Sequence, residues 1–351
     1  MKPIRFGLLG SGFMGRTHAE AVRRADDAEL VAVAQGSRAE GLAKRYDVAW
    51  EADAAALLRR PDVDAVIIST PHHLHADAGV AAMQAGKHVL IEKPLATTLV
   101  DCDRLAEAAT AHDRVLAVGY HQRFRYNNRM ACDWIRNGRM GKLTVAQVSM
   151  PMFASKIQTG GFGGDWAWWN DPKSVGHLFN SVPHAIDLLR WFTGTEVATV
   201  SAFCRTLLPD VPVEDTTLTM FEMSGGTMGS LFSSRALPAP SFPGEDFRFR
   251  LMGESGLLDL DPTHQLLASD AAGWRTIATQ ARINHEGADT AFGDVRMQAY
   301  RDQISAFIDA VRGIPSEVGR WADGRAGVAA CVAMLESSDQ RRWVSPMMAA
   351  E

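Results

Sequence analysis

The first 120 residues alternate short apolar runs with helix-forming stretches, and this rhythm limits the fold more than any other feature. The apolar runs are Ile4–Leu9, Leu30–Ala34, Ala65–Ser69, His88–Ile91 and Val115–Val118. Helices are expected between them, at Met14–Ala25, Ala39–Arg45, Ala52–Arg59, Leu74–Ala85 and Leu99–Ala111. Continuously apolar strands are buried on both faces, so the alternation predicts an α/β, doubly wound parallel sheet of the Rossmann type with right-handed crossovers.

After about residue 120 the pattern changes, because several strand-like runs follow one another without helices between them. These runs are Leu143–Ala154, Ala198–Leu207, Thr216–Met223, Thr227–Ser233, Asp246–Met252 and Gly256–Asp259. Helices are expected at Phe124–Asn137, Pro183–Phe192, Met297–Arg312 and Gly324–Ser338. This arrangement predicts an α+β domain with an open, mostly antiparallel sheet. We therefore expect a Rossmann domain over residues 1–122 and a second, α+β domain over residues 123–351.

Length and charge exclude several classes of protein. A chain of 351 residues with 46% hydrophobic residues can bury two separate cores. Its net charge of -5 argues against a general nucleic-acid or anionic-membrane binder, which would need a basic surface. The N-terminus enters an apolar strand at once, and no stretch approaches the roughly 20 apolar residues of a membrane helix. We expect a cytoplasmic protein.

The four cysteines are widely scattered. Cys102, Cys132, Cys204 and Cys331 form neither a CxxC pair nor a metal-ligand spacing. We interpret them as reduced structural thiols and expect no metal.

A glycine-rich turn follows the first predicted strand. Gly10-Ser11-Gly12-Phe13-Met14-Gly15 has the spacing G-x-G-x-x-G at the start of a predicted helix. The first glycine permits a tight turn, the second lets the backbone approach a pyrophosphate, and the third lets helix and strand pack closely. Amide groups at the helix N-terminus then face the phosphates. The motif predicts dinucleotide binding.

The residues after the second strand bear on which dinucleotide binds. NAD-specific proteins usually carry Asp or Glu there to bind the ribose 2′-hydroxyl, and this chain has Gln35. Ser37 and Arg38 offer hydrogen bonds to a 2′-phosphate, although Arg38 in a solvated first helical turn, stacked on adenine, is the alternative. We favour NADP over NAD slightly, and dual specificity stays open.

Three further segments carry motifs that occur together in one enzyme family. They are Ser69-Thr70-Pro71-His72-His73-Leu74-His75, the segment Gly86-Lys87-His88-Val89-Leu90-Ile91-Glu92-Lys93-Pro94-Leu95, and Gly176 to Trp191 with Asn180, His184 and Asp187. They resemble the TPxxxH loop, the GKHVxxEKPxA signature and the GGxxxDxxxHxxDxxRW segment of the Gfo/Idh/MocA family, which includes glucose-fructose oxidoreductase and inositol dehydrogenase. The likeness covers nearly the whole chain, including Tyr300–Gly313.

The resemblance implies an NAD(P)-dependent oxidoreductase acting on a secondary alcohol of a sugar, glycoside or cyclitol. It also implies a homo-oligomer, a dimer or tetramer, that associates through the open sheet of the second domain. Lys93 is then a catalytic lysine beside the nicotinamide and substrate, with Glu92 and Pro94 shaping its loop. Its position supports the role, because ligands of open α/β sheets bind beyond the carboxyl ends of strands, where an ammonium stabilises a reacting oxygen.

His184 is the expected proton-transfer residue, since alcohol oxidation releases a proton and histidine titrates near neutral pH. Pro183 suits a first helical turn, and Asn180 or Ser181 suits the N-cap, so we expect His184 at a helix N-terminus, where the dipole favours the neutral base. The family usually has Asp where this chain has Asn180. Asparagine cannot accept a proton, and we assign it an orienting role at the substrate.

Other residues near this site are weaker candidates. By resemblance, a first group lies along the cofactor: Thr70, Pro71, His72, His75 and His121. Arg123 follows the last Rossmann strand and is a candidate for substrate contact. Trp166, Trp168 and Trp169 precede the catalytic helix, where aromatic rings suit the apolar face of a sugar, although core packing accounts for them about as well.

Two other functions stay open from the sequence alone. One is a hydrolase or lyase that retains NAD and oxidises a sugar transiently, as some relatives of this family do. The other is a cofactor-binding protein without chemistry. The lysine and histidine favour an enzyme, whereas Asn180 slightly favours the non-catalytic alternative.

Overall fold

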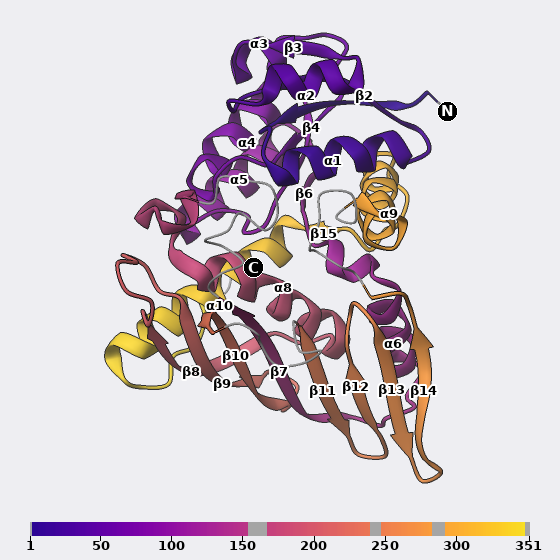
Figure 1. Cartoon of the computed structure of the whole chain (residues 1–351), viewed down its shortest axis with the longest axis vertical. Helices are drawn as coiled ribbons and strands as arrows, with labels where there is room; N and C mark the ends of the chain where they lie inside the picture. The colour runs from indigo at the N-terminus through magenta and orange to yellow at the C-terminus, as the bar shows by residue number, and fades with distance from the viewer. Residues whose placement is uncertain (1, 154–166, 239–246, 283–291, 348–351) are drawn as a thin grey trace. The chain divides into compact units, whose positions relative to one another are not determined.

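The computed structural model describes residues 2–153, 167–238, 247–282 and 292–347, which form two compact units (Figure 1). The first unit contains the described residues up to His121 and those from Phe292 to Arg325. The second contains the described residues of 122–287 and those from Ala326 onward. The division predicted from the sequence assigns everything after residue 122 to the second domain, so the structure differs for Phe292–Arg325.

Helix α9 (Asp294–Val311) accounts for this difference, because it packs within the first unit. The ring of Phe307 lies 5.9 Å from that of Phe6 on the first strand. Beyond the helix, Arg312 forms an ion pair with Asp27 at 2.8 Å. The apolar periodicity of α9 predicts a helix but not the sheet that it covers.

The first unit is built on a seven-stranded sheet whose order is β15-β6-β5-β4-β1-β2-β3. Its strands are β1 (Ile4–Leu9), β2 (Ala28–Ala34), β3 (Ala49–Glu51), β4 (Ala65–Ile68), β5 (His88–Ile91), β6 (Leu116–Val118) and β15 (Gly319–Arg320). All pair in parallel except β15, which is antiparallel to β6. The Rossmann prediction is confirmed. Strands β3 and β15 were not predicted, because runs of three and two residues carry no pattern.

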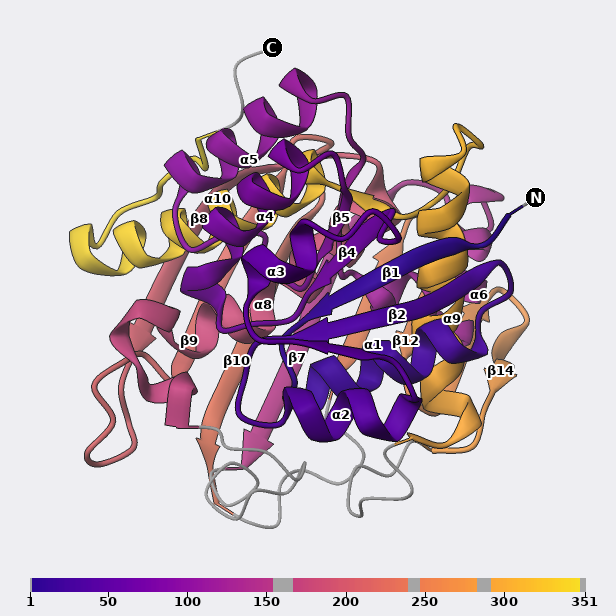
Figure 2. The same cartoon turned by 90° about the horizontal axis from the view of Figure 1, so that it is seen from above.

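Helices cover both faces of this sheet, as right-handed crossovers on either side of β1 require. They are α1 (Phe13–Arg24), α2 (Ala39–Tyr46), α3 (Ala54–Leu58), α4 (His75–Gln84), α5 (Leu99–Ala111) and α9. Helix α1 packs against α9, and α4 packs against α5, on opposite sides of the strands (Figure 2). The side chains of β4 are all buried, which matches their continuous apolar sequence.

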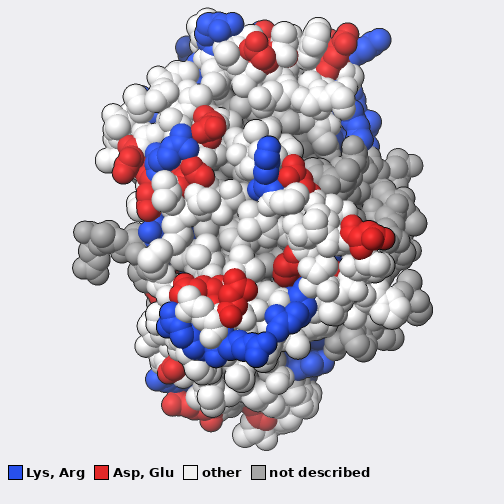
Figure 3. All heavy atoms as spheres, turned by 90° about the vertical axis from the view of Figure 1, so that its left-hand side faces the viewer, with Lys and Arg blue, Asp and Glu red and all other residues white. Residues whose placement is uncertain are grey.

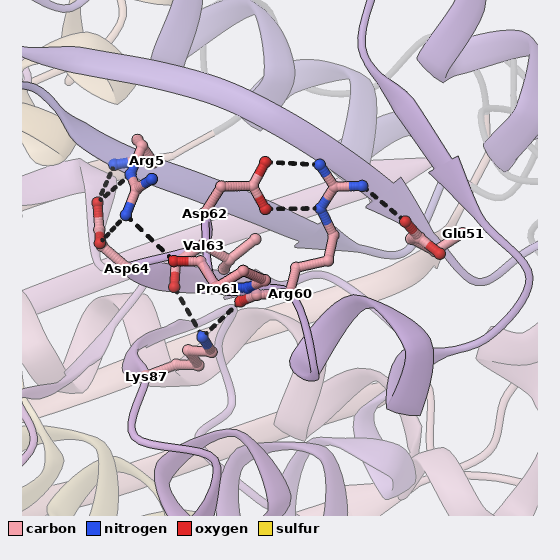
Figure 4. A network of polar contacts seen from close by, with 8 residues as sticks. All are labelled: Arg5, Glu51, Arg60, Pro61, Asp62, Val63, Asp64 and Lys87. Atoms are coloured by element: carbon pink, nitrogen blue, oxygen red, sulfur yellow. Dashed lines mark hydrogen bonds and ion pairs between the residues drawn. The ribbon is translucent and has the colours of Figure 1, made fainter.

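The amino end of this sheet is fixed by a network of polar contacts around Lys87 (Figure 4). Its ammonium, which is almost fully buried, donates to the backbone carbonyls of Arg60 and Val63, both at 2.8 Å. Arg60 in turn pairs with Glu51 and Asp62. Lys87 precedes β5, so it lies at the sheet edge opposite to the carboxyl end where Lys93 follows the same strand. The lysine of the GKHV motif therefore holds loops together.

The second unit contains an eight-stranded sheet in the order β14-β13-β12-β11-β7-β10-β9-β8. Its strands are β7 (Leu143–Phe153), β8 (Val197–Arg205), β9 (Thr216–Met223), β10 (Met228–Leu237), β11 (Arg248–Gly253), β12 (Leu257–Leu260), β13 (Gln265–Asp270) and β14 (Gly273–Thr279). The pair β7–β10 is parallel and the other pairs are antiparallel, which confirms a mostly antiparallel sheet. Strand β14 was not predicted, because most of its side chains are exposed and it shows no apolar alternation.

Three helices accompany this sheet: α6 (Tyr126–Arg136), α8 (Gly176–Thr193) and α10 (Trp321–Gln340). Helix α8 packs on β7, β9 and β10. Ser337 and Ser338 of α10 accept hydrogen bonds from the backbone amides of Ala202 and Cys204 on the edge strand β8, at 3.0 and 2.9 Å. Donors that would otherwise be exposed at the sheet edge are thereby satisfied.

Helix α8 begins seven residues earlier than the sequence predicts, so one expectation about its start is wrong. Pro183 lies inside the helix, where it leaves the carbonyl of Phe179 without the usual amide partner. The helix tolerates this loss because nearly every side chain from Gly176 to Leu189 is buried. Asn180 and Ser181 therefore do not cap the helix. His184 lies in its middle, and the argument from the dipole at a helix N-terminus does not apply, since that effect is confined to the first turn.

The described residues include no helix that is both long and apolar enough to span a bilayer. On the face drawn in Figure 3, Lys and Arg side chains lie beside Asp and Glu side chains in mixed clusters. All four cysteines are free thiols, and Cys102, Cys132 and Cys331 are buried, as the prediction of structural thiols requires. Within the described part of the chain, no three His, Cys, Asp or Glu side chains gather as a metal site would need.

The three glycines of the turn after β1 have different steric requirements. Gly10 has a φ of 107°, and a Cβ there would lie 2.6 Å from the carbonyl oxygen of Ser69. A Cβ on Gly15 would lie 2.2 Å from the carbonyl oxygen of Gly10, so strand and helix approach too closely for any side chain. A Cβ on Gly12 would meet nothing within 4 Å. Of these three positions, only position 12 has room in the fold for a side chain.

We expect Gly15→Ala to destabilise the chain by about 2–3 kcal/mol, because the backbone must shift to relieve the overlap. Gly12→Ala should cost less than about 1 kcal/mol, since its methyl group meets open space and only the N-cap preference is lost. Urea unfolding of both variants beside the unaltered chain measures the difference. Equal destabilisation by the two substitutions would contradict this account of the turn.

Candidate active site

The open space at Gly12 lies where a pyrophosphate is expected. Gly12 is the N-cap residue of α1, and no side chain caps the first amides of this helix. Close by, Thr70 follows the carboxyl end of β4, and its buried hydroxyl has no hydrogen-bond partner among the described residues. Strand order reverses between β1 and β4, which is the position where open α/β sheets bind nucleotides. The unfilled space and the unpaired hydroxyl therefore fit a bound dinucleotide.

The end of β2 supplies the residues expected at the adenosine ribose. Gln35 has a φ of 65°, and its buried side-chain oxygen has no partner among the described residues. Ser37 and Arg38 are exposed. The backbone amide of Arg38 donates to the Ser11 hydroxyl in the glycine turn at 3.2 Å, which ties this loop to the turn. The Gln35 oxygen, which can accept a hydrogen bond from a ribose hydroxyl, therefore lies on the same loop as Ser37 and Arg38, whose exposed side chains can donate hydrogen bonds to a phosphate.

Lys93 follows β5 at the same carboxyl edge, and its side chain is half-buried. It is joined to Pro94 by a cis peptide bond. Burial lowers the pKa of the Lys93 ammonium, and the negative charge of Glu92 opposes this shift. A lysine with a lowered pKa gives up its proton more readily than a lysine in water.

His75 holds the Lys93 loop in place. Its Nδ1 lies 2.8 Å from the carbonyl oxygen of Pro94 and its Nε2 lies 2.9 Å from that of Thr70. The imidazole is fully buried, and burial lowers its pKa. Because both ring nitrogens face backbone carbonyls, His75 joins two loops, and its expected place along the cofactor stays a prediction. His72, which packs edge-on against His75, is also buried.

Glu92 is buried beside Lys93 and interacts with α1. One carboxylate oxygen lies 2.7 Å from Nε2 of His18, and the other accepts the backbone amide of Lys93 at 3.2 Å. Burial raises the pKa of Glu92, but the hydrogen bond and the charge interaction with His18, together with the charges of Lys93 and His75, outweigh it, so the net shift is downward. Glu92 thus contributes a carboxylate charge to the lysine loop, and it does not face the open turn at Gly12.

His121, expected near the nicotinamide, stacks on Tyr300 of α9. The ring centroids lie 4.2 Å apart, and the Tyr300 hydroxyl lies 3.3 Å from Nε2 of His121. Both residues are buried. The structure therefore joins His121 to α9 at the end of β6, close in sequence to the start of the second unit.

In the second unit, Asn180 and His184 lie one helical turn apart on α8 and share a face of that helix. Both are buried, with 9% and 8% of their surface exposed. His177, a turn earlier, lies 3.2 Å from the Ser233 hydroxyl on β10. The helix therefore carries a row of polar side chains on its buried face.

Arg123 forms a buried ion pair with Asp187 of α8. Its Nε contacts both carboxylate oxygens at 3.1 and 2.9 Å, and Nη2 contacts one at 2.5 Å. The guanidinium thus fixes the segment before α6 against α8, one turn beyond His184. Such a pairing leaves Arg123 a supporting role in the geometry of α8, whereas the sequence suggested substrate contact.

Of the three tryptophans expected before the catalytic helix, the structure describes the side chain of Trp169. Trp166 and the Trp168 side chain lie outside the described residues, and Trp169 is buried with 8% of its surface exposed. Packing therefore accounts for Trp169.

The sequence predicts a site at the carboxyl edge of the first sheet, and the glycine turn, Thr70, Glu92 and Lys93 all lie at that edge. It missed His18, Tyr300 and His177. A single histidine inside an amphipathic helix gives no signal of its partner, and His18 and Glu92 are 74 residues apart.

Comparison with known proteins identifies the family of the chain. A family model described as an oxidoreductase family with an NAD-binding Rossmann fold matches residues 4–120, and one described as the GFO/IDH/MocA C-terminal domain matches residues 128–259. The chain is 27% identical to myo-inositol 2-dehydrogenase of Thermotoga maritima over 74% of this chain and 75% of that protein.

Two other relatives widen the comparison. The chain is 27% identical to 2,7-anhydro-N-acetylneuraminate hydratase of Mediterraneibacter gnavus, over 55% of this chain and 50% of that protein. Levoglucosan dehydrogenase in complex with NADH and L-sorbose has a similar fold, with a TM-score of 0.85 at 24% identity over 99% of this chain and 100% of that one. The chain belongs to the Gfo/Idh/MocA family of oxidoreductases, with an NAD-binding Rossmann domain followed by the family's C-terminal domain.

Proposed function

We propose that this oxidoreductase transfers a hydride between a secondary alcohol of a sugar, glycoside or cyclitol and a nicotinamide dinucleotide. The observation that carries the proposal is a half-buried lysine with a lowered pKa, held at the same sheet edge as the open glycine turn. The relatives named for inositol and levoglucosan support a polyhydroxylated ring as substrate.

The bound nicotinamide supplies the redox chemistry, as hydride acceptor or donor. Lys93 then hydrogen-bonds the substrate hydroxyl and stabilises the negative charge that develops on its oxygen. Burial of Lys93 strengthens this interaction, because a charge acts more strongly where water is excluded. Glu92 and His75 keep the lysine loop in place through contacts to its backbone.

His184 takes the proton that oxidation releases, and returns it in the reverse reaction. Its place in the middle of α8 holds the imidazole on a buried helix face. Asn180, one turn earlier, orients the substrate by hydrogen bonding and carries no charge. Arg123 supports both residues by holding α8 through Asp187.

A second candidate is a lyase or hydratase that retains its cofactor and oxidises the substrate only transiently. The similarity to a hydratase of an anhydro sugar favours it. Net change in nicotinamide absorbance distinguishes the two, because the retained-cofactor reaction produces none.

For the cofactor, we propose a preference for NADP. The loop after β2 presents the Gln35 amide where a carboxylate would repel a 2′-phosphate, and Ser37 and Arg38 are exposed beside it. The arginine guanidinium suits a phosphate because it donates two parallel hydrogen bonds.

We further propose that the chain forms a homo-oligomer through the second sheet. Along β9, Thr217, Thr219 and Phe221 are buried, whereas Leu218 and Met220 are 52% and 55% exposed. Exposed Phe203 on β8 pairs in register with Leu218. An apolar patch on one sheet face is well suited to a second copy of the same patch.

Lys93→Met should lower kcat by about 10²- to 10⁴-fold with a sugar or cyclitol substrate, because the group that stabilises the reacting oxygen is lost. Cofactor affinity should change by less than about threefold, since the pyrophosphate site is elsewhere. Turnover across a panel of sugars, glycosides and cyclitols with both cofactors, and nicotinamide fluorescence titration, measure these effects. Lys44→Met, on the exposed surface of α2, is the control. Turnover retained by the Lys93 variant would remove this lysine from the reaction.

Arg38→Ala should raise the Kd of NADPH by about 10-fold or more, because a charge-assisted hydrogen bond to phosphate is lost, and should leave the Kd of NADH within about twofold. Gln35→Asp should shift preference towards NADH by adding a negative charge at the ribose. Fluorescence titration of both nucleotides tests both variants. Tighter binding of NADH than NADPH by the unaltered chain would reject the proposed preference.

Leu218→Glu should convert the oligomer to a monomer, because two copies of the charge would meet across the apolar face. Light scattering coupled to size-exclusion chromatography measures the mass. Trp50→Glu is a matched control, since this residue is 51% exposed but lies in the first unit. A monomeric mass for the unaltered chain at micromolar concentration would contradict the proposal.

A further inference from the structure

A line of buried polar side chains runs through the first unit from α1 to the lysine loop. His18 of α1 is fully buried, and its Nε2 lies 2.7 Å from the Glu92 carboxylate, which is 5% exposed. The other oxygen of Glu92 accepts the backbone amide of Lys93. His18 is thus linked to the lysine backbone through a single carboxylate.

The surroundings of His18 indicate which nitrogen carries a proton. Its Nδ1 is buried and has no hydrogen-bond partner among the described residues. A neutral ring with its proton on Nε2 leaves only an acceptor unpaired at Nδ1, whereas an imidazolium would leave an unpaired donor. Unpaired buried donors are the costlier of the two. We assign a proton to Nε2, so His18 donates to Glu92.

The Glu92 carboxylate has little freedom to move away from this donor. Gly119, at the end of β6, packs against it so closely that a Cβ there would lie 3.1 Å from the oxygen that faces His18. His75 lies on the other side of the loop, bound to the Pro94 carbonyl. The carboxylate is thus enclosed by α1, β6 and the loop after β5.

Helix α9 also packs against His18. The Tyr300 ring meets the His18 ring edge-on at 6.0 Å and stacks on His121. Arg296 lies 4.8 Å from the Tyr300 ring and donates to the Thr17 hydroxyl at 3.2 Å. These contacts fix the histidine ring in the plane that reaches Glu92.

We propose that His18 is a positioning residue for the reaction, acting through Glu92 on Lys93. By donating to the carboxylate, it holds the negative charge and the backbone of the lysine loop in one arrangement. Because His18 belongs to α1, whose first turn faces the pyrophosphate site, this contact joins the cofactor helix to the catalytic lysine. The inference rests on the proposed function of Lys93.

The charges around Lys93 predict in which direction the loss of His18 shifts the pKa of Lys93. The titratable groups that bear on Glu92 include His18 on α1, His75 on α4 and Lys93, and Glu92 in turn bears on Lys93. Burial raises the pKa of Glu92, and the His18 hydrogen bond reverses this shift. Without His18, Glu92 would take up a proton more readily, and the charge that sustains the Lys93 ammonium would weaken. The pKa of Lys93 would then fall further.

The test measures the protonation of Lys93 directly, without any substrate. Trace acetylation of the full-length chain over a range of pH, followed by mass spectrometry of the Lys93 peptide, reports the fraction of neutral amine. His18→Leu removes the donor at similar volume, and His18→Gln places an amide donor near the position of Nε2. Val22→Ala, a buried substitution one turn along α1, is the structural control.

We expect His18→Leu to move the Lys93 profile to lower pH by roughly half a unit, which is about threefold more labelling at a fixed pH below the midpoint. His18→Gln should restore most of the shift, and Val22→Ala should cause none. In turnover assays, His18→Leu should lower kcat more than it changes the KM for the cofactor, with the alkaline limb moved to lower pH.

A Lys93 profile for His18→Leu that overlaps the unaltered one would overturn the inference, whatever the effect on turnover. An equal shift in Val22→Ala would also overturn it, because general loosening of α1 would then suffice. Should His18→Leu not fold, Glu92→Gln must give the same downward shift for the inference to stand. If the labelling shifts but no polyol is turned over, the coupling between His18 and the protonation of Lys93 stands. The proposed reaction is then rejected.

Discussion

Parallel pairing of β1 with both β2 and β4 is the constraint on which the site depends. It brings the carboxyl ends of three strands to one edge, so the glycine turn, Gln35 and Thr70 lie around a single opening. The 2.2 Å approach between a Cβ on Gly15 and the Gly10 carbonyl shows how closely helix and strand must pack for this. Loops at that edge then carry chemistry, while those at the amino edge, such as the one around Lys87, carry contacts that hold the sheet.

Buried polar groups at this edge are satisfied mostly through the backbone. His75 contacts two carbonyls, and Glu92 accepts an amide as well as its histidine. Such contacts hold a loop without using the groups that meet substrate. Among the buried side-chain atoms that have no partner in the described residues, the Thr70 hydroxyl and the Gln35 oxygen lie where a nucleotide is expected.

Local patterns in the sequence were enough to predict the Rossmann sheet, the glycine turn and the position of Lys93, because strand, turn and loop are adjacent in the chain. The pairing of His18 with Glu92 spans 74 residues and has no local signal. Pro183 misled the placement of α8, since burial along that helix outweighed the usual effect of proline. Strand β14, which is mostly exposed, shows no alternation that could reveal it. What could not be predicted are the tertiary contacts that override or complete a local preference.

The two units differ in the charge of their candidate-site residues. On the polar face of α8, the residue one turn before His184 is an uncharged amide, and Asp187, the carboxylate after it, is paired with Arg123. Within the first unit, the carboxylate that acts on Lys93 is Glu92, and burial alone would favour its protonated form. The hydrogen bond from His18 opposes the effect of burial, so a buried histidine on α1 bears on the charge beside Lys93.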